Sequence, residues 1–158
     1  MTPLNNDVLA QIRAAFPRVA IEADNAFVPW GRTYLDAKPY QRELMGKSWD
    51  QLDRSYLERR SDALGFLGTQ HLVAVLPAYL EALIEGGLDS QVPGMLTLIL
   101  APPRPGTDDG LGATRFDALL DALTAPQRAA VGAALRCFAD QHPDTSLARA
   151  ARAALAAW

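Results

Sequence analysis

The sequence predicts an all-α fold: one domain over residues 1–158, a bundle of five to seven helices around one core, with an irregular aromatic segment near the N-terminus. Three observations predict it. Helix-capping patterns recur along the chain, apolar residues follow them at helical spacing, and strand patterns are weak. A chain of 158 residues suits a single domain and buries roughly 68–70% of its unfolded surface, enough for a core without disulfides.

The first predicted helix covers residues 4–16. Asn5 is a suitable N-cap residue, and Val8, Ile12 and Phe16 fall on one face. Pro17 ends the helix, because proline has no backbone N–H to donate. The following part, up to residue 47, is the least regular of the chain, since prolines and glycines interrupt it repeatedly.

The next helix is predicted over residues 48–60. Ser48 and Gln51 have the spacing of a capping box, in which each side chain binds the backbone N–H of the other residue. Acidic residues lie in its first turn and arginines near its end, as the helix dipole favours. We therefore expect one continuous helix. Its apolar face holds Trp49, Leu52 and Tyr56.

A longer helix is predicted over residues 69–85, with Thr69 as its N-cap residue and Pro77 inside it. At about 100° per residue, four leucines fall within an arc of about 80°, so the apolar stripe keeps its phase across the proline. Pro77 lies about 140° from the first leucine, near the polar side. The proline either bends the helix or begins a second one. The leucines are Leu72, Leu76, Leu80 and Leu83.

Residues 93–100 form a run too short for periodicity to separate a helix from a strand. Pro93 as an early helical residue and Pro102 as a stop favour a short helix. Residues 101–113 are predicted to form a loop, since they are rich in proline and glycine.

Three helices are predicted in the last third, over residues 114–123, 124–142 and 145–158. Short turns between them make antiparallel neighbours. Their starts are marked by Thr114, by a capping box of Thr124 and Gln127, and by Thr145 or Ser146.

Composition and charge exclude several classes of protein. The formal net charge is −3 and no basic patch dominates, which disfavours nucleic-acid binding. No run approaches the 18–20 or so apolar residues of a membrane span. The N-terminus has neither the basic nor the apolar region of a signal peptide. We therefore expect a soluble, cytoplasmic protein without a membrane segment.

Residues of reactive types are scattered, and each is interpreted as structural. His71 and Glu81 lie about 15 Å apart along one predicted helix, too far to share a ligand. Glu81 and Glu85 are expected on a solvated face. Cys137, the only cysteine, is expected to pack as a small apolar residue, and 106–110 as a turn rather than a calcium loop. No metal site and no cofactor are predicted.

The segment over residues 22–42 is the strongest candidate for binding. It alternates aromatic with charged side chains, and aromatic residues and arginine are typical of protein interfaces. A long aromatic loop either packs onto the body of the protein or binds a partner. If it binds, the candidate contact residues are Glu22, Asp24, Phe27, Trp30, Arg32, Tyr34, Asp36 and Tyr40.

Several stretches together resemble a family of small bacterial proteins of unassigned function. They are "SWDQL", "ALGFLGTQHLVAVLPAYLEALIE", "RFDALLDALTAPQRAAVGAALRCFADQ" and the terminal "AARAALAAW", about two-thirds of the chain. The family pattern has a Trp-containing helix, an "FL…YLPAYL" segment, an "L…LT..Q..AV…L" helix pair and a Trp near the end. This chain has Val73 and Val75 where the family usually has aromatics, and residues 17–47 match least.

Such proteins are similar to the immunity and accessory proteins of contact-dependent toxin systems. The resemblance implies a non-catalytic inhibitor that binds and occludes a toxin domain. We expect a monomer or a weak homodimer. Two alternatives stay open. One is a small enzyme that assembles a site from Glu22, Asp24, Asp36 or Asp50; the other is an adaptor that self-associates through Trp30 or Trp158.

Overall fold

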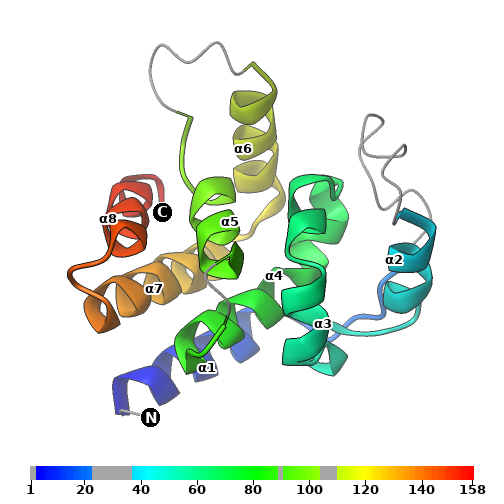
Figure 1. Ribbon diagram of the computed structural model, residues 1–158, viewed down its shortest axis with the longest axis horizontal. Coiled ribbons are helices and arrows are strands. Elements are labelled where there is room, and N and C mark those ends of the chain that lie inside the picture. The colour runs from blue at the N-terminus through cyan, green and yellow to red at the C-terminus, as the bar shows by residue number, and fades with distance from the viewer. Residues whose placement is uncertain (1–2, 23–36, 89–90, 104–109) are drawn as a thin grey trace.

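The computed structural model describes residues 3–22, 37–88, 91–103 and 110–158 (Figure 1). These residues form eight α-helices and three short 3₁₀-helices, with no strand among them, which confirms the all-α prediction. The elements are α1 (Pro3–Ala15), α2 (Ala37–Leu44), η2 (Trp49–Gln51), α3 (Arg54–Arg59), η3 (Asp62–Gly65), α4 (Thr69–Glu85), α5 (Gln91–Ile99), α6 (Gly110–Ala122), α7 (Ala125–Gln141), α8 (Ser146–Ala154) and η4 (Leu155–Ala157).

Two local differences separate the observed helices from the predicted ones, and the first brings the number of α-helices from seven to eight. α2 folds within the part of the chain that was predicted to be irregular. Its Tyr40 and Leu44 side chains are fully buried, so tertiary packing stabilises a helix that local propensity does not indicate. The second difference is the division of the helix predicted over residues 48–60.

Asp53 divides that predicted helix into η2 and α3. Its carboxylate accepts a hydrogen bond from the Tyr56 backbone N–H at 2.7 Å, so Asp53 is the N-cap residue of a new helix. The contact predicted at the start does form, since the Ser48 backbone N–H donates to Gln51 Oε1 at 2.9 Å. The single-helix prediction was wrong because the aspartate side chain competes with the backbone for helical hydrogen bonds.

Helix α4 lies at the centre of the fold and packs against α1, α3, α5, α6 and α7. Ten of its 17 residues are buried, so it is covered over most of its circumference. Pro77 lies inside this one unbroken helix, which resolves the alternative of two short helices. Its ring is buried, so the prediction that it lies near the polar side was wrong. The helix starts after Gly68 rather than with Thr69 as its cap.

At the N-terminus, α1 begins at Pro3 and contains Asn5, which is therefore not the predicted cap. Asn5 is buried, and its Oδ1 accepts a contact of 3.7 Å from the Cys137 thiol on α7. Val8, Ile12 and Phe16 share the buried face, as predicted. α1 packs against α4 and α7 through this face.

Residues 91–99 form the helix α5, as the flanking prolines predicted. α6 begins at Gly110, four residues before the predicted cap at Thr114. The starts of the last two helices are better predicted. The Thr124 backbone N–H donates to Gln127 Oε1 at 2.9 Å, and the Thr145 hydroxyl accepts from the Ala148 N–H at 3.0 Å. α7 and α8 pack against each other, and the chain ends in η4 beside α7.

Candidate functional site

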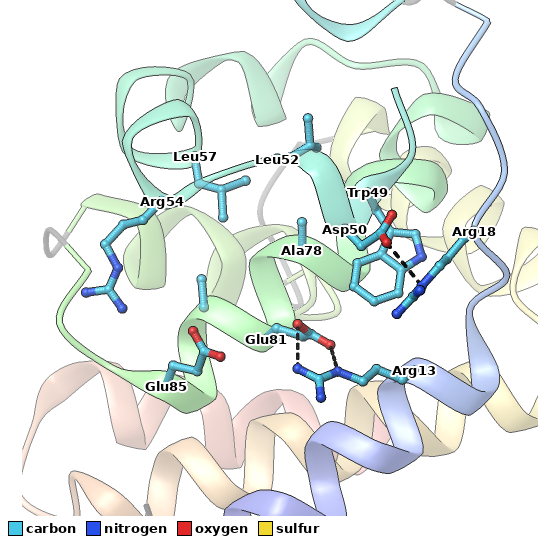
Figure 2. A pocket seen from close by; sticks show the side chains of 11 residues that line it. Arg13, Arg18, Trp49, Asp50, Leu52, Arg54, Leu57, Ala78, Glu81 and Glu85 are labelled. Atoms are coloured by element: carbon cyan, nitrogen blue, oxygen red, sulfur yellow. Dashed lines mark hydrogen bonds and ion pairs between the residues drawn. The ribbon is translucent and has the colours of Figure 1, made fainter. Parts of the chain in front are cut away.

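A cleft opens between α1, η2, α3 and α4, with a volume of about 310 Å³ (Figure 2). We call it the charged cleft. Its polar lining consists of Arg13, Arg18, Asp50, Arg54, Glu81 and Glu85. Its apolar lining consists of Trp49, Leu52, Leu57, Ala78 and Ala82.

One wall of the charged cleft is fixed by an ion pair between Arg13 of α1 and Glu81 of α4. Arg13 Nε donates to Glu81 Oε1 at 2.7 Å, and Nη2 donates to Oε2 at 3.3 Å. This two-point contact, together with the charge of Glu81, raises the pKa of Arg13. The Arg13 side chain is 50% exposed and that of Glu81 only 17%, so the arginine is the more exposed member of the pair.

A second ion pair lies at the Trp49 end of the cleft, where Arg18 Nε is 3.1 Å from Asp50 Oδ2. Here too the arginine is the more exposed partner, 63% against 28%. The Arg18 guanidinium carbon also lies 5.9 Å from the ring centre of Trp49, within the range of a cation–π contact. Ser48 Oγ donates to Asp50, which holds the carboxylate from its other side.

Arg54 and Glu85 lie at the opposite end of the cleft in Figure 2. Arg54 Nη2 donates to the carbonyl of Gly86 at 2.7 Å, where α4 ends with φ of 76°. Gly87, which follows, has a φ of 76°, a conformation that favours glycine, and a Cβ atom there would lie 2.6 Å from Arg54 Nη1. Glu85 is exposed.

This arrangement suits binding through hydrogen-bond donors. Arginine N–H groups surround an apolar floor, and two of the three carboxylates are already engaged by arginines. Arginine forms bidentate contacts with planar anions, and its ion pairs here fix the orientation of two of the forks. Burying part of a ligand over Ala78 and Ala82 adds apolar contact.

Sequence reasoning placed binding elsewhere, in the segment over residues 22–42. Of its candidates, the structure describes only the two ends of the segment. Glu22 is exposed, and its backbone carbonyl contacts His71 Nε2. Tyr40 is fully buried, so its prediction as a contact residue was wrong. Its ring belongs to the core. The other predicted contact residues lie outside the described residues: Asp24, Phe27, Trp30, Arg32, Tyr34 and Asp36.

The charged cleft itself was missed, and one prediction concealed it. Glu81 was expected on a solvated face, whereas it is largely buried beside Arg13; only Glu85 is exposed as predicted. Arg13 and Glu81 are 68 residues apart, so no local spacing relates them. The only sequence signal was an arginine on the first helix and a carboxylate on the polar side of the fourth.

The other residues of reactive types are placed as structural groups. Cys137 is buried, and burial raises the pKa of its thiol, which disfavours the thiolate. The rings of His142 and Phe138 are in tilted contact, with centres 4.9 Å apart. Within the part of the chain that the structure describes, no three ligand-type side chains gather as a metal site would need.

Of the residues named for the two alternative functions, Asp50 is bound by Arg18 and Ser48 in the charged cleft. Trp158 is half-buried, and its Nε1–H donates to the Leu100 carbonyl at 2.7 Å. Its ring also packs edge-on against Phe116, with centres 5.9 Å apart.

Comparison of the chain with protein-family models, with curated proteins and with solved structures finds no match in any of the three. The described helices include none with the length and apolar composition that crossing a membrane requires.

Proposed function

We propose that this chain is a non-catalytic protein-binding protein, an immunity-type inhibitor that binds and occludes a bacterial toxin domain. The observation that carries the proposal is the charged cleft, a pocket with exposed arginines beside a buried tryptophan. Arginine and aromatic residues dominate the energetics of protein interfaces, and arginines already held in place lose less side-chain entropy on binding.

Exposed apolar side chains beside the cleft support the same proposal. Val19 follows Arg18 directly and is 63% exposed, and Met45 is 56% exposed. The segments that carry them are adjacent, because the Gly46 N–H donates to the Ile21 carbonyl at 3.0 Å and the Ile21 N–H to the Lys47 carbonyl at 2.8 Å. Apolar side chains next to charged ones are typical of a partner-binding surface.

The aromatic segment over residues 22–42 begins on this surface, since exposed Glu22 follows Ile21. We propose that it extends the contact area with acidic and aromatic side chains. Inhibition would then be steric and electrostatic, through coverage of the toxin's working surface. Such an inhibitor acts in the cytoplasm of the cell that makes the toxin, as a monomer or a weak homodimer.

The test is neutralisation by the full chain. Toxins encoded next to its gene are expressed with and without it, and growth of the host is measured. Binding is measured separately by capture of the purified toxin domain. We expect one such toxin to be captured and neutralised; a chain that folds normally yet neither binds nor neutralises any of them would contradict the proposal.

A further inference from the structure

The charged cleft has more free hydrogen-bond donors than acceptors. Arg13 uses Nε and Nη2 on Glu81, which leaves Nη1. Arg18 uses Nε on Asp50, and Arg54 uses only one nitrogen, on the Gly86 carbonyl. The buried Trp49 Nε1–H has no acceptor among the described residues. An occupant that supplies acceptors would satisfy the free donors of the exposed arginines.

The ion pairs are oriented so that positive groups face outward. In both, the arginine side chain is more exposed than the acidic side chain it binds, 50% against 17% for Arg13 and Glu81 and 63% against 28% for Arg18 and Asp50. A molecule that approaches the cleft therefore meets arginine N–H groups before it meets Glu81 or Asp50. In Figure 2, Arg13 and Arg18 lie toward the end that Trp49 closes, whereas Glu85 lies toward the other end with Arg54.

A cationic occupant fits the same geometry poorly. Its best partner would be the face of Trp49, but this residue is only 3% exposed and Arg18 already lies over its ring. A lysine or arginine of a partner would also meet Arg13 and Arg18 at the mouth of the cleft. Glu85 is the one exposed carboxylate left to attract it, at the far end.

The geometry points to a carboxylate-binding site at the Arg13–Arg18 end of the charged cleft, which receives an acidic side chain of the protein partner. Two guanidinium groups bind the carboxylate oxygens, and the apolar floor at Ala78 contacts the methylenes of the acidic side chain. This inference deepens the proposed function. The carboxylate-binding site stands on the geometry of the cleft, whereas the protein partner as the source of the carboxylate rests on the proposed function. A free small carboxylic acid shares the same chemistry, so the experiment separates the two sources.

The first arm uses glutarate as a probe of the site, with glutaramide as the neutral molecule of equal length. Each is titrated into the ¹⁵N-labelled full chain at low salt, and the Arg Nε and Trp Nε1 resonances are followed, with Trp49→Phe identifying the Trp49 signal. We expect millimolar binding of glutarate that shifts the Arg13, Arg18 and Trp49 signals and weakens with salt. Equal shifts from glutaramide, or shifts elsewhere only, would overturn the site.

Variants test the assignment of residues. Arg18→Gln is expected to weaken glutarate binding about fivefold to tenfold, because one charge-assisted contact is lost. Glu85→Gln is expected to strengthen it about twofold, since an exposed like charge is removed. Arg149→Gln, an exposed arginine of α8, is the matched control and leaves binding unchanged. Arg18 is the variant of choice because its exposure makes misfolding a minor concern, and circular dichroism verifies the fold.

The second arm uses the captured toxin partner and Arg18→Glu. We expect this reversal to abolish capture, and Arg149→Glu to preserve it. If the wild-type chain captures a toxin and Arg18→Glu captures it equally well, the inference fails while the proposed function stands. If no toxin is captured but glutarate binds as expected, the proposed function fails and the carboxylate comes from a small molecule, which overturns the protein source.

Discussion

Three buried tyrosines meet where α2 packs onto α3 and α4. The rings of Tyr40 and Tyr56 lie 6.1 Å apart, and the Tyr79 hydroxyl donates to the Arg60 carbonyl at 3.4 Å. The Glu43 carboxylate accepts from Arg60 Nη2 at 2.7 Å, so an ion pair closes the edge of this cluster. Burial raises the pKa of all three tyrosine hydroxyls above the ordinary value of about 10.

These raised pKa values predict alkaline unfolding. Above pH 10 or so the unfolded chain releases protons that the folded chain keeps, so stability is full below this pH and falls as the pH rises beyond it. Denaturant unfolding between neutral and alkaline pH measures the decline. Tyr56→Phe should make it less steep, because one linked proton is removed. Tyrosinate absorbance from the buried rings that develops before helical circular dichroism is lost would contradict the prediction.

Arg115 holds together the turn between η3 and α4. Its Nη2 donates to the carbonyls of Leu64 at 2.7 Å and Leu67 at 3.0 Å, and Nη1 contacts the carbonyl of Gly65. Burial lowers the pKa of this guanidinium, a sign of its partial desolvation. The carbonyls that follow a 3₁₀ turn lack helical hydrogen-bond donors, and the Arg115 side chain supplies donors to them.

Arg115→Met is therefore expected to lower the free energy of unfolding by about 2 kcal/mol, because partly buried carbonyls lose their donors while the aliphatic bulk is kept. Urea unfolding followed by circular dichroism measures the change. The matched control is Arg136→Met on the exposed side of α7, expected to change stability by less than about 0.5 kcal/mol. Equal effects of the two substitutions would refute the role of Arg115.

At the scale of elements, α4 shows why a proline can persist in a central helix. Pro77 removes one helical hydrogen bond, at a cost of about 3 kcal/mol in an ordinary helix interior. Its ring is buried, however, and two methylenes more than alanine contribute about 1.6 kcal/mol of burial. The rigid ring also reduces the entropy of the unfolded chain by about 0.4–1 kcal/mol. These terms nearly cancel.

Pro77→Ala should accordingly change the free energy of unfolding by less than about 1 kcal/mol. Helix geometry should change, and partner capture should persist, because the ring is buried and lies outside the lining of the charged cleft. Leu76→Ala, at a fully buried neighbour, is the contrast and should cost about 2–5 kcal/mol. A Pro77→Ala chain that folds normally but loses its partner would show that α4 itself forms the binding surface.

Local sequence patterns predicted several elements whose decisive interactions are local, although the caps expected at Asn5, Thr69 and Thr114 do not form. The capping box of Thr124 and Gln127 is an example, because its contacts span three residues. Asp53 misled the prediction, since an aspartate near a helix start suits both the dipole and a new N-cap, and only the structure selects between them. The charged cleft could not be predicted in the same way: its ion pairs join residues 68 and 32 positions apart.

At the scale of the whole molecule, the last residue of the chain connects three helices. Trp158 Nε1–H donates to the Leu100 carbonyl after α5, and the ring packs edge-on against Phe116 of α6. A Cβ atom on Gly132 of α7 would lie 3.4 Å from the Trp158 Cβ, at van der Waals contact, so α7 lies directly against the terminal residue. Figure 1 shows the C-terminus close to α5, although Trp158 and Leu100 are 58 residues apart in the sequence.

This connection predicts that the bundle loses cooperativity when the tryptophan is removed. Trp158→Ala should lower the free energy of unfolding by about 3 kcal/mol, and Trp158→Phe by about 1 kcal/mol, since phenylalanine keeps the ring contact but not the hydrogen bond. Hydrogen exchange should lose protection first in α5 and α6. Helix α1, which packs on α4 and α7 away from the tryptophan, should keep its protection longest. Uniform loss of protection across all helices would mean that the core around α4, rather than the C-terminal tryptophan, couples α5 and α6 to the rest of the fold.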